Sequence, residues 1–280
     1  QMLIQRALGI PEPLYAHLPL IMDSTHKKLS KRTGAKALTE YRELGLLPEA
    51  MLNYLAFLGW NPGDEREYLS RGEFIEAFDL SRVQKGSAIF DEVKLLSVNQ
   101  HWMRELPDSD FLAHLKTRFD LEELALRSNL VLKAVPLLKE RAHTFKEARE
   151  MLQGELSCLF SEPKLEREKL LMKEPAGRSG VAIMALKGLL KPIKGLPEGV
   201  SAEVVKEAIM PFADALAGQV EEAKGLAAQA GKGGRGAVLW PLRYALSGQE
   251  RSPDPFALIS ILGSQETISR IKKAVAILEG

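Results

Sequence analysis

Beyond Pro107, the apolar residues of this chain recur at helical spacing, and runs typical of β-strands are nearly absent. Thr144 followed by Glu147 has the pattern of a capping box, in which two side chains satisfy the free amides of a helix start. Ser201 is a similar N-terminal signal, and we expect its helix to end at Gly218. These patterns predict a mainly α fold.

Two other stretches carry strong helix patterns. Pro48 fits the first turn of a helix, and Gly59 is expected to form its left-handed C-terminal cap. The last helix is expected from about Gln265 onward. We expect two apolar stripes to pack into the core, one on each helix: Met51, Leu55 and Leu58, and then Ile268, Ile271, Val275 and Leu278.

A chain of 280 residues is longer than one compact core usually serves, so several domains are expected. Pro107 marks one break, and the composition shifts again near residues 174–180. The predicted division is 1–35, 36–106, 107–178 and 179–280.

Composition excludes several classes of protein. The net charge is +1, so any surface for nucleic acid must come from local clusters of Lys and Arg. A single cysteine, Cys158, rules out a disulfide framework and favours a cytoplasmic protein. The five histidines are scattered without ligand spacing, which predicts no metal site. No apolar run is long enough for a membrane span.

The segment HKKLSKRTG (26–34) concentrates four cations between residues 27 and 32. A flexible basic loop of this kind can close on a polyphosphate, where an ammonium group stabilises the charge that moves during phosphoryl or nucleotidyl transfer. The alternative is a solvated basic loop without a ligand.

The KLSKR sequence resembles the KMSKS signature of class I aminoacyl-tRNA synthetases, in the form found in glutamyl-tRNA synthetases. The resemblance covers roughly 1–106 and 236–279, and is weaker between them. It includes the segments HLPLIM, EYRELGLLPEAMLNYLAFLGWNPGD, FDLSRVQKGSAIFDEVKLLSVNQHW and LWPLRYALSGQERSPDPFALISILGSQETISRI. The resemblance implies the end of a class I catalytic domain at 1–35 and a stem-contact region at 36–106. An all-helical anticodon-binding region would follow, in two parts.

The resemblance also implies roles for the loop residues. Lys31 would contact the ATP phosphates while glutamyl-adenylate forms, and Lys28, Ser30 and Arg32 would help to bind ATP. ATP with Mg²⁺ is the expected cofactor of the intact enzyme, with none held by this chain alone.

The sequence departs from the family at two places in this loop and lacks a further motif. The family commonly has Asp-Gly where Thr25-His26 stands, and His where Thr33 stands. These changes affect loop geometry more than charge. The family's HIGH-type motif, which grips ATP opposite the loop, occurs nowhere in these residues. We therefore expect a C-terminal portion that does not aminoacylate tRNA by itself.

Two arginines are candidates for anticodon contacts. Arg141 precedes the Thr144 cap, and its R-x-x-T context resembles that of a family arginine that helps to read the third anticodon base. The alternative is a surface arginine paired along its helix. Arg243 follows Trp240 by three positions and is expected to meet either the anticodon arm or a local carboxylate. Trp240 itself is expected in the core.

The leading hypothesis is the tRNA-binding portion of a glutamate–tRNA ligase, with tRNA-Glu, glutamate and ATP as partners of the intact enzyme. One alternative is a non-catalytic helical module that binds RNA or docks a protein. Another is a non-discriminating ligase that also charges tRNA-Gln. A glutaminyl-tRNA synthetase fits less well, because its C-terminal part is a β-barrel and these residues predict helices.

Overall fold

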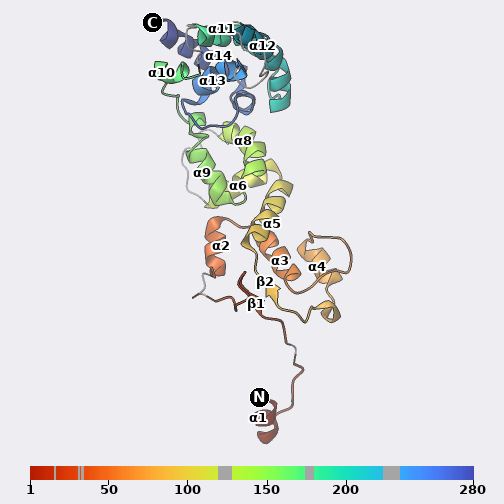
Figure 1. Ribbon diagram of the computed structural model, residues 1–280. Coiled ribbons are helices and arrows are strands. Elements are labelled where there is room, and N and C mark those ends of the chain that lie inside the picture. Colours follow the sequence, from red (N-terminus) through yellow and green to blue (C-terminus); the bar gives the residue numbers. More distant parts are fainter. Residues whose placement is uncertain (16, 31, 33–34, 119–127, 174–179, 223–233) are drawn as a thin grey trace. The chain divides into compact units, whose positions relative to one another are not determined.

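The computed structural model describes residues 1–15, 17–30, 32, 35–118, 128–173, 180–222 and 234–280. The chain divides into two compact units, 1–105 and 106–280. Helices dominate both of them, which confirms the mainly α fold class (Figure 1). The expected boundary at 178 lies outside the described residues.

In its described residues, the first unit contains helices, one short 3-10 helix and two short strands in the following order: α1 (Met2–Ala7), β1 (Ile21–Met22), α2 (Leu38–Leu44), α3 (Pro48–Phe57), α4 (Arg71–Ala77), η2 (Leu80–Arg82), β2 (Ala88–Ile89) and α5 (Glu92–Glu105). The strands pair in parallel, with Ile21 opposite Ala88 and Met22 opposite Ile89. This small sheet fixes the segment that leads into the basic loop.

Helix α3 begins at Pro48 as predicted, but it buries a different face from the one expected. Its buried residues are Ala50, Asn53 and Tyr54, and Leu55 of the expected stripe is exposed. The polar side chains turn inward because each finds a partner. Asn53 accepts from the amide of Leu69 at 2.6 Å, and the Tyr54 hydroxyl accepts from the amide of Asp91 at 2.7 Å.

The leucines of α3 instead line an apolar pocket of about 340 Å³ that also includes residues of β1, β2 and α4. The expected left-handed cap at Gly59 is wrong as well. The helix ends at Phe57, its C-cap Leu58 is right-handed, and Gly59 is not among the described residues with positive φ. The buried Trp60 anchors this end by donating its indole N–H to the carbonyl of Asp79 at 3.1 Å.

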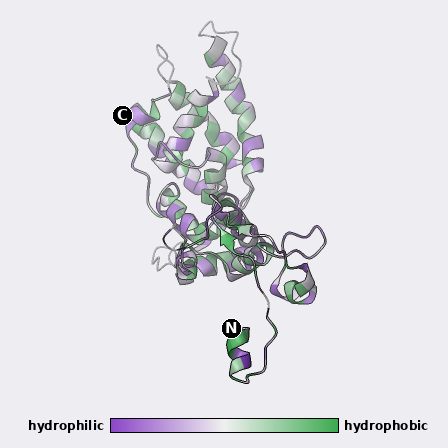
Figure 2. Cartoon of the chain, turned by 60° about the horizontal axis from the view of Figure 1, so that its bottom comes forward, coloured by the Kyte–Doolittle hydropathy of each residue, from purple (hydrophilic) through white to green (hydrophobic). Residues whose placement is uncertain are grey.

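The second unit is helical throughout its described part, in the following order: α6 (Asp108–Arg118), α8 (Ser128–Arg141), α9 (Phe145–Gln153), η3 (Ser157–Leu159), α10 (Arg167–Leu170), α11 (Val181–Lys194), α12 (Ala202–Glu222), α13 (Gly234–Ser247) and α14 (Pro255–Glu279). Helices α6, α8 and α9 pack together, and α11 to α14 form a second bundle (Figure 1). Figure 2 shows hydrophobic and hydrophilic residues alternating around the helices, as burial of one face of each requires.

Three predicted helix signals can be compared with the structure. The Thr144 hydroxyl accepts from the amide of Glu147 at 3.1 Å, as the capping pattern predicted. In a capping box, the Glu147 carboxylate would accept from the amide of Thr144. It accepts instead from the amide of the preceding residue, His143, at 2.7 Å. The predicted end at Gly218 is wrong, because α12 continues to Glu222. Its neighbours Ala217 and Val220 are buried, so packing favours the longer helix.

The last helix begins earlier than expected, at Pro255, but it is broken inside by Gly263. This glycine has φ 79° and ψ 168°, so two helical pieces meet there at a kink. The second piece agrees with the predicted start near Gln265. Of the predicted stripe, Ile271, Val275 and Leu278 are buried.

Candidate functional site

The basic loop of the first unit is entered through a tight turn built on Asp23. One carboxylate oxygen of Asp23 accepts from the Thr25 amide at 2.8 Å, the Thr25 hydroxyl at 2.7 Å and the Lys27 amide at 3.0 Å. These hydrogen bonds, that from the Thr25 hydroxyl first, hold the pKa of Asp23 below its usual value. The Asp23 amide also donates to the carbonyl of Lys27 at 2.8 Å, which closes the turn.

His26 takes the left-handed position of this turn, with φ 60°. It is the one non-glycine residue with positive φ in the part of the chain that the structure describes. Glycine adopts this conformation without steric cost, whereas a side chain with a Cβ is strained there. The departure from Asp-Gly noted in the sequence therefore lies at the position where glycine would be most useful.

Replacing His26 with glycine is expected to stabilise the first unit by about 1 kcal/mol, because the strain at positive φ disappears. Ser24→Gly in the same turn is the matched control. Ser24 is not among the residues with positive φ, so added flexibility should make that variant slightly less stable. Thermal unfolding of the two variants measures the difference, and a shift in the same direction for both would contradict the strain at His26.

The structure places three of the four predicted ATP-binding residues. Lys28 forms an antiparallel bridge with Met22, and its side chain is exposed. The Ser30 carbonyl accepts from the amide of Ala35 at 3.1 Å, and Arg32 is exposed. Neither Lys28 nor Arg32 pairs with a carboxylate among the described residues, so both cations are available to an anion. Lys31, the predicted catalytic residue, lies outside the described residues, as does Thr33.

Arg141 is the last residue of α8, and its guanidinium pairs with the carboxylate of Glu155. The Nη1–Oε1 distance is 2.9 Å, and the two side chains are 43% and 23% exposed. The partner is therefore a half-buried carboxylate beyond α9, and this contact lies outside the helix to which Arg141 belongs. The Arg141 side chain therefore stays partly exposed to solvent while it is paired.

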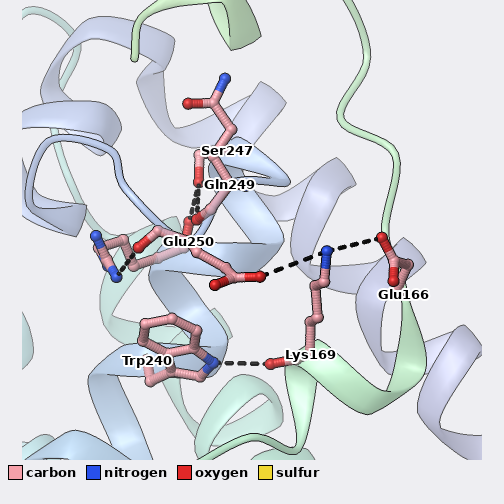
Figure 3. A network of polar contacts seen from close by, with 7 residues as sticks. Glu166, Lys169, Trp240, Ser247, Gln249 and Glu250 are labelled. Atoms are coloured by element: carbon pink, nitrogen blue, oxygen red, sulfur yellow. Dashed lines mark hydrogen bonds and ion pairs between the residues drawn. The ribbon is translucent and has the colours of Figure 1, made fainter. Parts of the chain in front are cut away.

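A second arginine site surrounds Trp240, which is half-buried near the middle of α13. The indole N–H of Trp240 donates to the carbonyl of Lys169 at 2.7 Å (Figure 3). The Arg243 guanidinium carbon lies 4.8 Å from the ring centroid, and the Lys173 ammonium lies 5.7 Å from it. Both contacts are in the range of cation–π attraction.

Backbone carbonyls, and no carboxylate among the described residues, hold the Arg243 guanidinium in place. It donates to the carbonyl of Glu250 at 2.8 Å and to that of Ser252 at 3.2 Å. Burial lowers the pKa of Arg243, although a guanidinium stays charged at neutral pH. Within the described ranges, these two carbonyls are the hydrogen-bond acceptors of the Arg243 guanidinium.

Lys169 closes one edge of this site. Its ammonium lies between the carboxylates of Glu166 at 3.0 Å and Glu250 at 3.5 Å (Figure 3). The hydrogen bond to Glu166 is the main reason why the pKa of Lys169 is raised. The sequence alone did not predict the roles of Lys169, Lys173 and Glu155. Lys169 and Lys173 contact Trp240, and Glu155 contacts Arg141, only in the folded chain, and no local sequence pattern indicates these contacts.

Two further findings limit the chemistry. Within the described ranges, no cluster of His, Cys, Asp and Glu could hold a metal ion. The same part of the chain contains no helix with the length and apolar character needed to cross a membrane.

Comparison with known proteins gives a family match in each unit. Residues 1–97 match the catalytic domain of class I tRNA synthetases (E and Q), and residues 110–275 match the anticodon binding domain family. The chain is 32% identical over 283 residues to a glutamate–tRNA ligase of Syntrophobacter fumaroxidans, covering 100% of this chain and 55% of that protein. It is 35% identical over 277 residues to glutamate–tRNA ligase 2 of Novosphingobium aromaticivorans, covering 96% and 51% respectively.

Solved structures give the same result. A crystal structure of a glutamate tRNA ligase from Elizabethkingia meningosepticum in complex with its amino acid matches with a TM-score of 0.67 and 32% identity. That match covers 99% of this chain and 54% of the other. The glutamate-tRNA synthetase of Elizabethkingia anophelis matches with a TM-score of 0.64 and 31% identity. The chain thus spans about half the length of the relatives that it matches.

Proposed function

Since the chain belongs to the anticodon binding domain family through residues 110–275, we propose that it is the tRNA-holding portion of a glutamate–tRNA ligase. The observation that carries the proposal is the aromatic face of Trp240 with two cations beside it, in the domain that matches that family. Aromatic and guanidinium planes stack on the splayed bases of a single-stranded RNA loop, and lysines beside them contact its phosphates.

The proposal assigns the two arginines to the anticodon of tRNA-Glu. Arg141 stays 43% exposed beside Glu155, and Arg243 has no carboxylate partner among the described residues. A planar guanidinium pairs with a base edge through two donors, which a lysine cannot do. The match to glutamate–tRNA ligases over nearly the whole chain supports tRNA-Glu as the partner.

In the intact enzyme the basic loop would act on ATP. Lys31 would neutralise the phosphates during adenylate formation, and Lys28, Ser30 and Arg32 would hold the loop against them. Lys28 and Arg32 are exposed and have no carboxylate partner among the described residues, which fits a polyphosphate ligand. ATP with Mg²⁺ supplies the activation of glutamate for transfer to tRNA.

We propose further that these 280 residues do not aminoacylate tRNA alone, because their sequence lacks the HIGH-type motif. The division into 1–35, 36–106, 107–178 and 179–280 is proposed to separate the end of the catalytic domain, the stem-contact region and two anticodon-binding parts. A cytoplasmic location accords with the single cysteine.

Binding of a tRNA-Glu transcript to the 280-residue chain tests this proposal. The logarithm of the affinity should fall linearly with the logarithm of the salt concentration between about 50 and 500 mM, because most contacts would be to phosphate. Arg141→Ala should weaken binding about tenfold or more, as loss of a base-reading arginine does.

The matched control is Arg251→Ala, which removes an exposed cation and should change the affinity less than about threefold. Equal losses for the two variants would make Arg141 an ordinary surface residue. Affinity that does not change across the salt range would instead favour the alternative of a helical module that docks a protein.

A further inference from the structure

Gln249 lies in the turn between α13 and α14 and contacts a segment 92 residues away in the sequence. Its side-chain amide donates to the Ser157 hydroxyl at 2.8 Å and to the carbonyl of Gly154 at 3.2 Å. In Figure 3 its side chain points away from Glu250 and Trp240, toward the opposite side of the turn. These two hydrogen bonds therefore join the turn between α13 and α14 to the segment that follows α9.

These two hydrogen bonds enclose Glu155, the residue that pairs with Arg141. Gly154 precedes Glu155 and Ser157 follows it by two positions, so both sides of Glu155 are held by one amide group. Glu155 is only 23% exposed, which leaves its carboxylate little freedom to follow Arg141 elsewhere. The position of the Arg141 guanidinium thus depends on where this segment is held.

The backbone of Gln249 is connected to Arg243 through the hydroxyl of Ser247. Its amide donates to the Ser247 hydroxyl at 3.2 Å, and that hydroxyl donates to the carbonyl of Arg243 at 2.9 Å. The next residue, Glu250, accepts from the Arg243 guanidinium through its carbonyl at 2.8 Å. One residue therefore connects the support of both arginines.

We propose that Gln249 is a positioning residue that fixes Arg141 and Arg243 relative to each other, so that both arginines engage one RNA loop. The inference rests on the proposed function, in which these arginines contact the anticodon of tRNA-Glu. An arginine held in the binding geometry loses less side-chain entropy when it meets a base, so its hydrogen bonds contribute more to affinity and discrimination.

A double-mutant cycle on the 280-residue chain tests the coupling. Binding is measured for Gln249→Ala, Arg141→Ala and the double variant, with tRNA-Glu and with a transcript changed at the third anticodon base. Gln249→Ala should weaken binding of tRNA-Glu about fivefold and reduce the preference over the changed transcript. The double variant should bind within about twofold of Arg141→Ala alone, because residues that act as a unit are not additive.

Gln153→Ala is the control, since Gln153 is exposed at the end of α9, four residues before Ser157. It should bind tRNA-Glu like the unchanged chain. Losses of Gln249→Ala and Arg141→Ala that multiply in the double variant would overturn the inference, and so would an unchanged affinity for Gln249→Ala. If Arg141→Ala alone has no effect, the proposed role of Arg141 in RNA binding is what fails.

A measurement without RNA distinguishes failure of the positioning role of Gln249 from failure of RNA binding by Arg141. In the free chain, the side-chain Nε–H resonance of Arg141 should shift and exchange faster with water in Gln249→Ala than in Gln153→Ala, because Glu155 is no longer held. An unchanged resonance would overturn the positioning role even if tRNA binding by Arg141 is established.

Discussion

Replacing Arg270 with leucine is expected to lower the free energy of unfolding of the second unit by about 3 kcal/mol. Arg270 lies on α14 with only 3% of its side chain exposed. Its guanidinium donates to the carbonyl of Leu246 at 2.6 Å and to that of Cys158 at 2.9 Å. It also pairs with the Glu266 carboxylate at 2.7 Å.

The leucine variant removes the donors and leaves both carbonyl groups buried without partners. Leu246 and Cys158 are themselves buried, so water cannot replace the lost hydrogen bonds without opening the core. The same change removes the hydrogen bonds that join α14 to the end of α13 and to η3, and the turn that carries Gln249 begins where α13 ends. We therefore expect weaker tRNA binding as well as lower stability.

Lys273→Leu is the matched control three residues further along α14. Lys273 pairs with Glu162, but both side chains are more than half exposed. An ion pair in solvent contributes little, so this variant should leave the unfolding free energy nearly unchanged. Denaturant unfolding followed by tryptophan fluorescence measures both variants, and Trp240 is the one of the three tryptophans that lies beyond residue 105. Equal effects of the two variants would contradict the stabilising role of the buried Arg270 hydrogen bonds.

Replacing Gly188 with alanine is expected to destabilise the same unit by about 2 kcal/mol. Gly188 lies in α11, where the ring of Phe212 from α12 packs directly on its Cα. A Cβ at this position would come within 2.5 and 2.9 Å of the two Cε atoms of that ring, and closer still to its Cζ. The ring must therefore move out, and its contact with α11 is lost.

Replacing Gly218, in the same bundle, with alanine is expected to have the opposite effect on stability. A Cβ at Gly218 in α12 meets no atom within 4 Å, so the gain in helix propensity should raise stability by about 0.5 kcal/mol. The difference in sign between two helical glycines isolates the packing at Phe212. If Gly188→Ala is as stable as Gly218→Ala, the close approach of the two helices is not required.

Local signals in the sequence predicted the elements that depend on neighbouring residues. The Thr144 cap, the helix start at Pro48 and the last helical piece after Gly263 follow from spacing and turn chemistry within a few positions. The departure at Thr25-His26 was also visible in the sequence, and it coincides with the left-handed residue of the turn. The buried face of α3 was predicted wrongly, because the partners of Asn53 and Tyr54 lie 14 to 37 residues away.

By itself, the sequence determined the mainly α fold class, the basic loop and the two candidate arginines, because periodicity, charge and motifs are properties of neighbouring residues. Only the tertiary structure decided which partners hold those arginines. Glu155 meets Arg141, Lys173 meets Trp240 and Gln249 meets Ser157 after the helices have packed. Such contacts join residues far apart in the chain, and burial of apolar faces selects them without leaving a local pattern.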